Sequence, residues 1–256
     1  MTLFADLDVS IIDHLPPGRK PINTSVVSDE NRAEIIKGIA AACAGKRQTY
    51  WVCPLIEESD VLQCRAAVGT QKFLEEALPS FRIGLVHGRM RSREKERAMR
   101  LFKSGKMDVL VATTVIEVGV DVPNASLMVI ENAERLGLSQ LHQLRGRVGR
   151  GSRQSDCLLL YQPPLSDMAR ARLELMRSTS DGFEIAERDM ELRGPGELFG
   201  ARQTGLQSLR VARLSRDANL IPQVQRAAEL MVERYPRNVE ALGRRWISST
   251  PNLGTV

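Results

Sequence analysis

Arginine and glycine alternate in one predicted loop, from Gln140 to Gly151, that has the residue types needed to contact phosphate groups. Four arginines stand at positions 145, 147, 150 and 153, with three glycines between them and no acidic residue before Asp156. Guanidinium groups donate paired hydrogen bonds to phosphate oxygens, and glycine lets a backbone approach a ligand closely. The stretch therefore predicts a phosphate-binding set of donors. The alternative is that the arginines bind carbonyl groups at the ends of helices.

Two further polar stretches follow apolar runs of the sequence. The first is His87 to Met90, which opens into a basic helical segment. The second runs from Ala112 to Pro123 and holds two hydroxyls, two carboxylates and a glycine: Thr113, Thr114, Glu117, Asp121 and Gly119. Because functional groups in an open α/β sheet gather beyond the carboxyl ends of its strands, we expect all three stretches to lie at that edge.

Short apolar runs alternate with helical patterns over the first two-thirds of the chain. Three of these runs are almost continuously apolar, which is typical of strands covered on both faces. The alternation predicts an α/β fold with a parallel sheet flanked by helices. The expected strands are 22–28, 49–54, 82–87, 108–113, 126–131 and 156–161, and the expected helices are 29–44, 61–78 and 92–103.

The pattern changes after Pro163 and Pro164. Two short helices, 166–178 and 183–191, are expected, followed by a glycine-rich stretch that ends at Gly205 and a helix over 210–234. We therefore expect two domains, residues 1–163 with the sheet and residues 164–256 with mainly helical structure.

Composition and charge narrow the class of protein. The chain is 43% hydrophobic and 26% charged, and it has no apolar run of the roughly 18 residues that span a bilayer and no secretion signal, so we expect a cytoplasmic protein. Its four cysteines have no metal-ligand spacing. Residues 82–106 hold nine basic and two acidic side chains. This local excess predicts a polyanionic partner; the alternative is a solvated helix face.

The motifs of this sequence resemble those of superfamily 2 helicases. The pattern Q-x-x-G-R-x-x-R at Gln143 to Arg150 resembles their motif VI, and Ala112 to Pro123 resembles motif V. Longer segments are similar to the RecG family of ATP-dependent branched-DNA helicases, and the resemblance continues to about Arg234. These segments are DLDVSIIDHLPPGR, VHGRM, DVLVATTVIEVGVDVPNA, ENAERLGLSQLHQLRGRVGRG and RDMELRGPGELFGARQTG.

The resemblance implies a RecA-like lobe, the second of two lobes that bind ATP and Mg²⁺ between them. It places Arg147 and Arg150 at the γ-phosphate, with Arg150 as the arginine finger. It also places Gln143, Gly119 and Asp121 beside the nucleotide.

The same resemblance implies residues that bind DNA or couple its movement to ATP hydrolysis. Arg172, Arg193 and Gln203 match a translocation motif built on a helical hairpin and a loop. The remaining residues of this group are His87, Arg89, Arg91, Arg93, Thr113 and Thr114.

One motif of these helicases is absent from the sequence. There is no G-x-x-x-x-G-K-[ST] phosphate loop, and Asp29-Glu30 is predicted to cap a helix rather than to bind Mg²⁺. We expect a first motor lobe and a DNA-splitting wedge domain to precede Met1, and the chain alone to lack ATPase activity. The expected function is remodelling of stalled forks and Holliday junctions. The alternatives are a lobe of a transcription-repair coupling translocase and a non-enzymatic module that binds duplex DNA through the basic helix.

Overall fold

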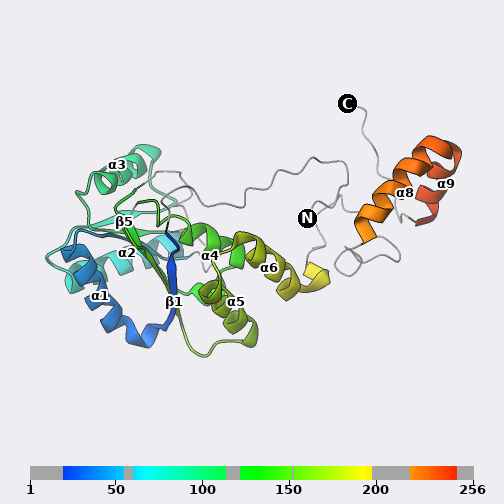
Figure 1. Ribbon diagram of the computed structural model, residues 1–256. Coiled ribbons are helices and arrows are strands. Elements are labelled where there is room, and N and C mark those ends of the chain that lie inside the picture. Colours follow the sequence, from blue (N-terminus) through cyan, green and yellow to red (C-terminus); the bar gives the residue numbers. More distant parts are fainter. Residues whose placement is uncertain (1–19, 55–59, 114–121, 152, 198–219, 247–256) are drawn as a thin grey trace. The chain divides into compact units, whose positions relative to one another are not determined.

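The computed structural model describes residues 20–54, 60–113, 122–151, 153–197 and 220–246. A six-stranded sheet lies at its centre, with all paired strands parallel, in the order β1-β6-β5-β2-β4-β3 (Figure 1). The parallel α/β sheet predicted from the sequence is confirmed. The strands are β1 (Asn23–Ser28), β2 (Gln48–Val52), β3 (Ile83–Val86), β4 (Val109–Ala112), β5 (Ala125–Ile130) and β6 (Asp156–Tyr161).

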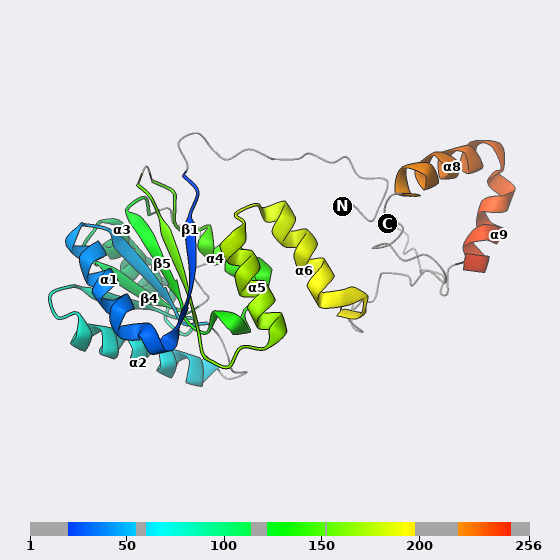
Figure 2. The same cartoon turned by 60° about the horizontal axis from the view of Figure 1, so that its bottom comes forward.

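Helices flank this sheet, as Figures 1 and 2 show. On one face, α1 (Arg32–Ala44) and α2 (Asp60–Ala77) bury apolar side chains in a core that contains Trp51. On the other face, α3 (Ser92–Lys103), α4 (Leu138–Arg145) and α5 (Asp167–Ser178) pack in a core that contains Tyr50. Because successive side chains of a strand point to opposite faces, β2 contributes to both cores, which explains its continuous burial.

The basic segment forms α3 because its apolar residues share one side of the helix. Ala98, Met99 and Phe102 are buried, and the Phe102 ring lies 4.9 Å from that of Tyr50 between centroids. At the first turn, the Glu94 carboxylate accepts a hydrogen bond of 2.9 Å from the backbone N–H of Arg91. The predicted helix over 92–103 is confirmed with the same bounds.

The turn before α1 differs from the prediction in its capping residue. Ser28 is the cap, since its hydroxyl accepts from the backbone N–H of Glu30 at 3.3 Å. Asp29 stands inside the short 3₁₀ turn η1 (Asp29–Asn31) and pairs with Arg32, 2.8 Å away. The predicted cap is therefore one residue too late, because a serine in extended conformation precedes the acidic pair.

The C-terminal third contains the two expected short helices. The second, α6 (Gly182–Glu197), continues six residues beyond its predicted end. The helix α8 (Ile221–Arg234) lies within the predicted range 210–234, of which residues 210–219 are outside the described part. The helix α9 (Pro236–Trp246) was not expected, although proline is favoured at a first helical position.

The chain divides into two compact units, Leu15–Leu192 and a second unit of Arg193–Val256 with Met1–His14. The unit with the sheet includes α5 and the start of α6, because Leu173, Met176 and Ile185 are buried in the same core as the sheet residues. The domain boundary near Pro163 stays a prediction. None of the helices in the described ranges is long and apolar enough to cross a membrane.

Candidate nucleotide and DNA sites

The stretches that begin at His87 and at Ala112 meet at the carboxyl edge of the sheet, as predicted. They follow the paired strands β3 and β4, and the amide of Thr113 donates to the carbonyl of Val86 at 3.2 Å. Thr113 is buried, and its hydroxyl has no hydrogen-bond partner among the described residues. Thr114 comes next and lies outside those residues.

His87 is a half-buried imidazole surrounded by cationic side chains. Its Nδ1 lies 3.4 Å from the Sγ of Cys64 on α2. Burial, and then the charges of Lys95 and Arg89, lower the pKa of His87 below its ordinary value. The imidazole is therefore neutral at pH 7, and the positive charge of this edge comes from arginines and lysines.

Arg89, Arg91 and Arg93 are the arginines at this edge. All three are exposed, and none makes an ion pair within the described part of the chain. Donors of this kind suit the phosphates of a nucleic acid.

The arginine-glycine stretch lies at the opposite, amino edge of the sheet. The side chain of Gln154 donates to the carbonyl of Pro21 at 2.7 Å, and the amide of Asn23 donates to the carbonyl of Ser155 at 3.0 Å. Gly149 has a φ of +76°, and a Cβ placed on it would lie 3.0 Å from the side chain of Ile22. These contacts place Gly149, Gln154 and Ser155 beside the start of β1. The prediction that all three stretches share the carboxyl edge is wrong for this one.

The cause is α4, which carries the chain back from β5 to the amino edge. The sequence was interpreted as a loop from Gln140 onward, yet Leu138–Arg145 is helical. Leu138, Leu141 and Leu144 are buried at a spacing of three residues. That spacing was a helical signal, but it covers only eight residues and stands among polar side chains.

The ends of the two motif-like stretches meet at this amino edge. A Cβ on Gly151 would lie 2.5 Å from the carbonyl oxygen of Pro123, so the two backbones approach as only glycine allows. Gly119 and Asp121, which stand shortly before Pro123, are outside the described residues.

The structure separates the four arginines into two classes. Arg145 is buried and donates to the carbonyls of Met176 at 2.9 Å and Thr179 at 2.8 Å, at the end of α5. Arg153 donates to the carbonyls of Gly45 and Lys46, 3.2 and 3.3 Å away, after α1. For these two arginines the helix-end alternative is confirmed, and the prediction of four phosphate donors is wrong.

Arg147 and Arg150 remain as candidate phosphate donors. Arg147 is half-buried, and its guanidinium makes no hydrogen bond or ion pair within the described ranges. Arg150 is exposed, as is Gln143 on α4. The stretch thus combines two arginines that bind backbone carbonyls with Arg147, whose guanidinium makes no such bond within the described ranges.

Arg145 also has a structural role that the sequence did not single out, which is to join the end of α4 to neighbouring elements. Besides the two carbonyls, its guanidinium lies 3.0 Å from the Nδ1 of His142. Burial lowers the pKa of its guanidinium from the ordinary value. A Cβ on Gly182, the first residue of α6, would lie 3.1 Å from the His142 ring. The end of α4 is therefore bound to the α5–α6 turn immediately before Arg147.

A second arginine ties the same helices together. Arg172 on α5 donates from Nη2 to the carbonyl of Glu134 at 2.7 Å, while its buried Nε has no partner in the described part of the chain. Arg193 is in α6, but its side chain is outside the description, as is all of Gln203. The three-residue translocation motif therefore stays a prediction.

An acidic and basic cluster at the carboxyl end of β5 was also missed. Arg32 donates to Glu131 at 2.6 Å and to Asp29 at 2.9 Å, and its guanidinium lies 5.5 Å from the ring centroids of both Trp51 and Phe73. Burial disfavours the charged guanidinium, but Glu131 and Asp29 outweigh it and raise the pKa of Arg32. The sequence did not reveal this cluster because Arg32 and Glu131 stand about a hundred positions apart, and local patterns do not connect them.

The four cysteines form no disulfide. Cys43, Cys53 and Cys157 are buried and Cys64 is half-buried. Burial raises the pKa of the Cys43 thiol to about 11 and that of Cys157 to about 12. Within the described ranges, no group of three histidine, cysteine or acidic side chains could hold a metal ion.

Comparison with known proteins gives two matching family models. Residues 32–152 match the helicase conserved C-terminal domain, and residues 179–242 match the C-terminal part of domain 3 of the ATP-dependent DNA helicase RecG.

Several relatives and one solved structure are similar over most of the chain. The chain is 59% identical over 250 residues to the ATP-dependent DNA helicase RecG of Haemophilus influenzae and 57% identical over 251 residues to that of Escherichia coli K12. The two matches include 97% and 98% of this chain but only 36% of the length of each relative. A structure of RecG bound to a three-way DNA junction matches 81% of this chain and 26% of its own, with a TM-score of 0.64 and 42% identity. On this evidence the chain corresponds, over nearly its whole length, to the C-terminal region of RecG helicases.

Proposed function

We propose that this chain is the second motor lobe and coupling module of an ATP-dependent DNA helicase that remodels branched DNA, including stalled forks and Holliday junctions. The observation that carries the proposal is the state of Arg147, which stands between two arginines that hold helix ends. Arg145 and Arg153 donate to backbone carbonyls, whereas the half-buried guanidinium of Arg147 makes no hydrogen bond or ion pair within the described ranges. The relatives are named as RecG helicases, and the solved relative is bound to a three-way junction, which supports branched DNA as the substrate.

In this proposal the chain completes a nucleotide site that a first lobe begins. Arg147 and Arg150 donate to the γ-phosphate oxygens as charge develops on them during hydrolysis. Gln143 orients the site, and Gly119 and Asp121 border the nucleotide. Mg²⁺ is proposed to be held mainly by the first lobe.

The carboxyl edge is proposed as the DNA-facing edge. Its residues would contact the phosphate backbone without reading sequence. The hairpin of α5 and α6 would transmit closure of the lobes to the DNA through Arg172, Arg193 and Gln203. The proposed DNA-facing residues are His87, Arg89, Arg91, Arg93, Thr113 and Thr114.

The site of action is proposed to be the bacterial cytoplasm, at the nucleoid.

The test is DNA-stimulated ATP hydrolysis by a longer protein in which the RecG first lobe precedes this chain. We expect Arg150→Ala to lower the rate about 10³- to 10⁵-fold, as loss of an arginine finger does. Arg153→Ala is the matched control, because that arginine binds backbone carbonyls after α1, and it should stay within a few-fold of the parent.

Two results would contradict the proposal. One is an Arg150→Ala variant that keeps the parent rate. The other is ATP hydrolysis by the 256-residue chain alone, since its sequence has no phosphate loop.

A further inference from the structure

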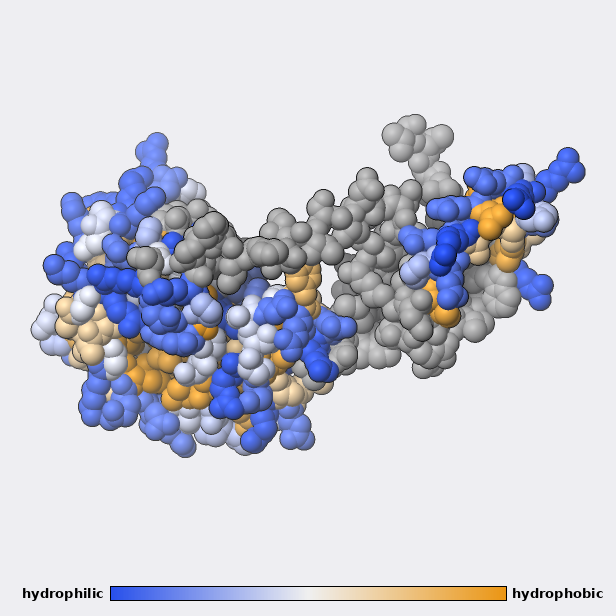
Figure 3. Space-filling view, viewed as in Figure 1, coloured by the Kyte–Doolittle hydropathy of each residue, from blue (hydrophilic) through white to orange (hydrophobic). Residues whose placement is uncertain are grey.

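The exposed side of α3 carries a continuous row of cations that begins at Arg93 of the carboxyl-edge site and continues beyond the residues assigned to that site or to the nucleotide site. Arg93, Arg97, Arg100 and Lys103 follow one another at spacings of four, three and three residues, and Lys106 continues the row on the turn after the helix. Residues at these spacings are neighbours on a helix surface. Figure 3 shows the surface around α3 as hydrophilic.

Folding alone does not explain this row. Like charges at these spacings repel and destabilise a helix. The helix dipole favours Arg100 and Lys103 in the last turn but not Arg93 and Arg97 in the first half. The acidic residues of α3 do not neutralise the row either, because Glu94 caps the helix and Glu96 lies 3.6 Å from Arg100 alone.

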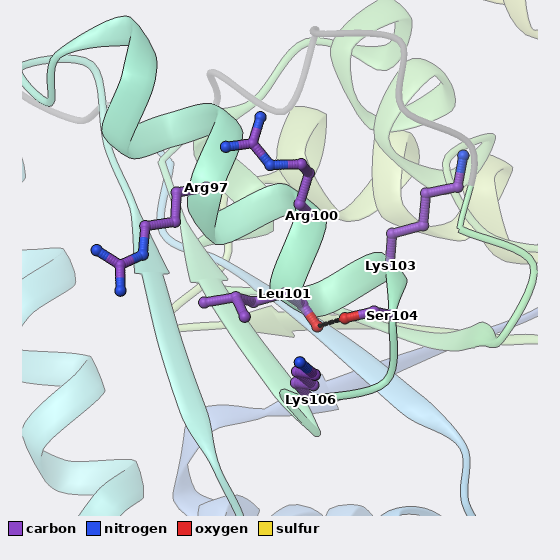
Figure 4. A pocket seen from close by; sticks show the side chains of 6 residues that line it. All are labelled: Arg97, Arg100, Leu101, Lys103, Ser104 and Lys106. Carbon is purple, nitrogen blue, oxygen red and sulfur yellow. Dashed lines mark hydrogen bonds between the residues drawn. The ribbon is translucent and has the colours of Figure 1, made fainter.

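The side chains of the row are arranged for an extended ligand. Arg97, Arg100, Lys103 and Lys106 line an open depression of about 460 Å³ with Leu101 and Ser104. Figure 4 shows Arg97, Arg100 and Lys103 extending from the helix in different directions instead of converging on one point. Four cations that converge would suit a single small anion, whereas a row that diverges suits a chain of anions.

We propose that this row, from Arg93 to Lys106, binds the phosphate backbone of one duplex arm of the branched DNA. At 1.5 Å per residue, the stretch from Arg93 to Lys103 is about 15 Å long. One DNA strand presents a phosphate about every 3.4 Å along the helix axis, so about four phosphates lie within that length, close to the number of cations. Aromatic residues are only 4% of the chain and none stands in the row, which disfavours stacking on single strands.

The inference rests on the proposed action on DNA and extends it along α3, away from the carboxyl edge. Its test is equilibrium binding of the 256-residue chain to a fluorescent duplex and to a fluorescent three-way junction between 50 and 200 mM salt, conditions over which phosphate contacts are weakened. The variant is the triple substitution Arg97→Ala, Lys103→Ala and Lys106→Ala. Alanine favours the helix at positions 97 and 103.

The triple variant should bind both DNAs more weakly. The negative slope of log affinity against log salt should become less steep by roughly 2 to 3, about 0.9 for each lost contact. The control is Lys37→Ala, Arg170→Ala and Arg177→Ala, which removes the same charge from α1 and α5 and should keep the parent slope. The inference is overturned if the triple variant keeps the parent slope or if the control lowers the slope equally. These measurements need no ATP, so they fail or succeed separately from the Arg150 test of the motor.

Discussion

Gly149 is a residue at which the backbone dictates the amino acid. Its φ is +76°, and a Cβ would press on Ile22 at 3.0 Å. Gly105 offers a matched comparison, because its φ is +73° but nothing lies within 4 Å of a Cβ there.

We therefore expect Gly149→Ala to destabilise the fold more than Gly105→Ala. The left-handed backbone costs about 1 to 2 kcal/mol in both variants, and the contact with Ile22 adds about 1 kcal/mol or more at position 149 alone. Urea unfolding measures the difference. Equal losses in the two variants would show that Ile22 moves aside freely.

His87 should respond to pH in a definite direction. Its folded pKa lies below the ordinary 6.5, so the unfolded chain binds more protons as the pH falls through that range. Acidification below pH 6.5 therefore removes stability from the folded state, and neutral pH restores it.

The charge of Lys95 contributes to this lowered pKa. We expect the His87 imidazole to titrate below pH 6.5 by NMR and Lys95→Met to raise its midpoint. Lys37→Met on α1 is the control and should leave the midpoint unchanged. A midpoint at or above 6.5 in the unsubstituted chain would contradict the burial argument.

At the scale of elements, α4 and α5 are joined by contacts of two arginines, the buried Arg145 and the half-buried Arg172. Arg145 reaches from the end of α4 to carbonyls at the end of α5, and Arg172 reaches from α5 to the carbonyl of Glu134 before α4. The two helices should therefore move together, as one piece.

Arg145→Met keeps the apolar stem but leaves the carbonyls of Met176 and Thr179 without that donor. We expect a loss of about 2 to 4 kcal/mol, because each unsatisfied buried acceptor costs about 1 to 3 kcal/mol. Thermal or urea unfolding measures this loss. Arg170→Ala, an exposed arginine on the same α5, should change stability by less than about 0.5 kcal/mol. A similar stability of the two variants would mean that Arg145 does not hold the helices.

For the whole molecule, the sequence predicts the sheet well because a strand buried on both faces is a short, continuous run of apolar residues. The runs that became β4 and β5 are buried throughout, and α3 repeats its apolar residues at helical spacing. The short α4 was missed because three leucines among polar residues form too brief a pattern.

The candidate site was less predictable, because partners far apart in sequence decide what each arginine does. The acceptors of Arg145 stand 31 and 34 positions away, and a run of guanidinium groups looks the same whether it binds phosphate or backbone. The edge was misassigned for a similar reason, since the direction of the chain at residue 146 depends on an unrecognised helix. The proposed roles of Thr114, Gly119, Asp121 and Gln203 concern residues outside the described ranges and stay predictions.

The opposite placement of Arg147 and Arg150 on one side, and of His87 and Thr113 on the other, has a consequence for the order of events in a working cycle. A triphosphate and a double helix would not compete for the same surface of this lobe. On the proposed function, the lobe therefore stays bound to duplex DNA while ADP leaves and ATP binds, which processive translocation requires.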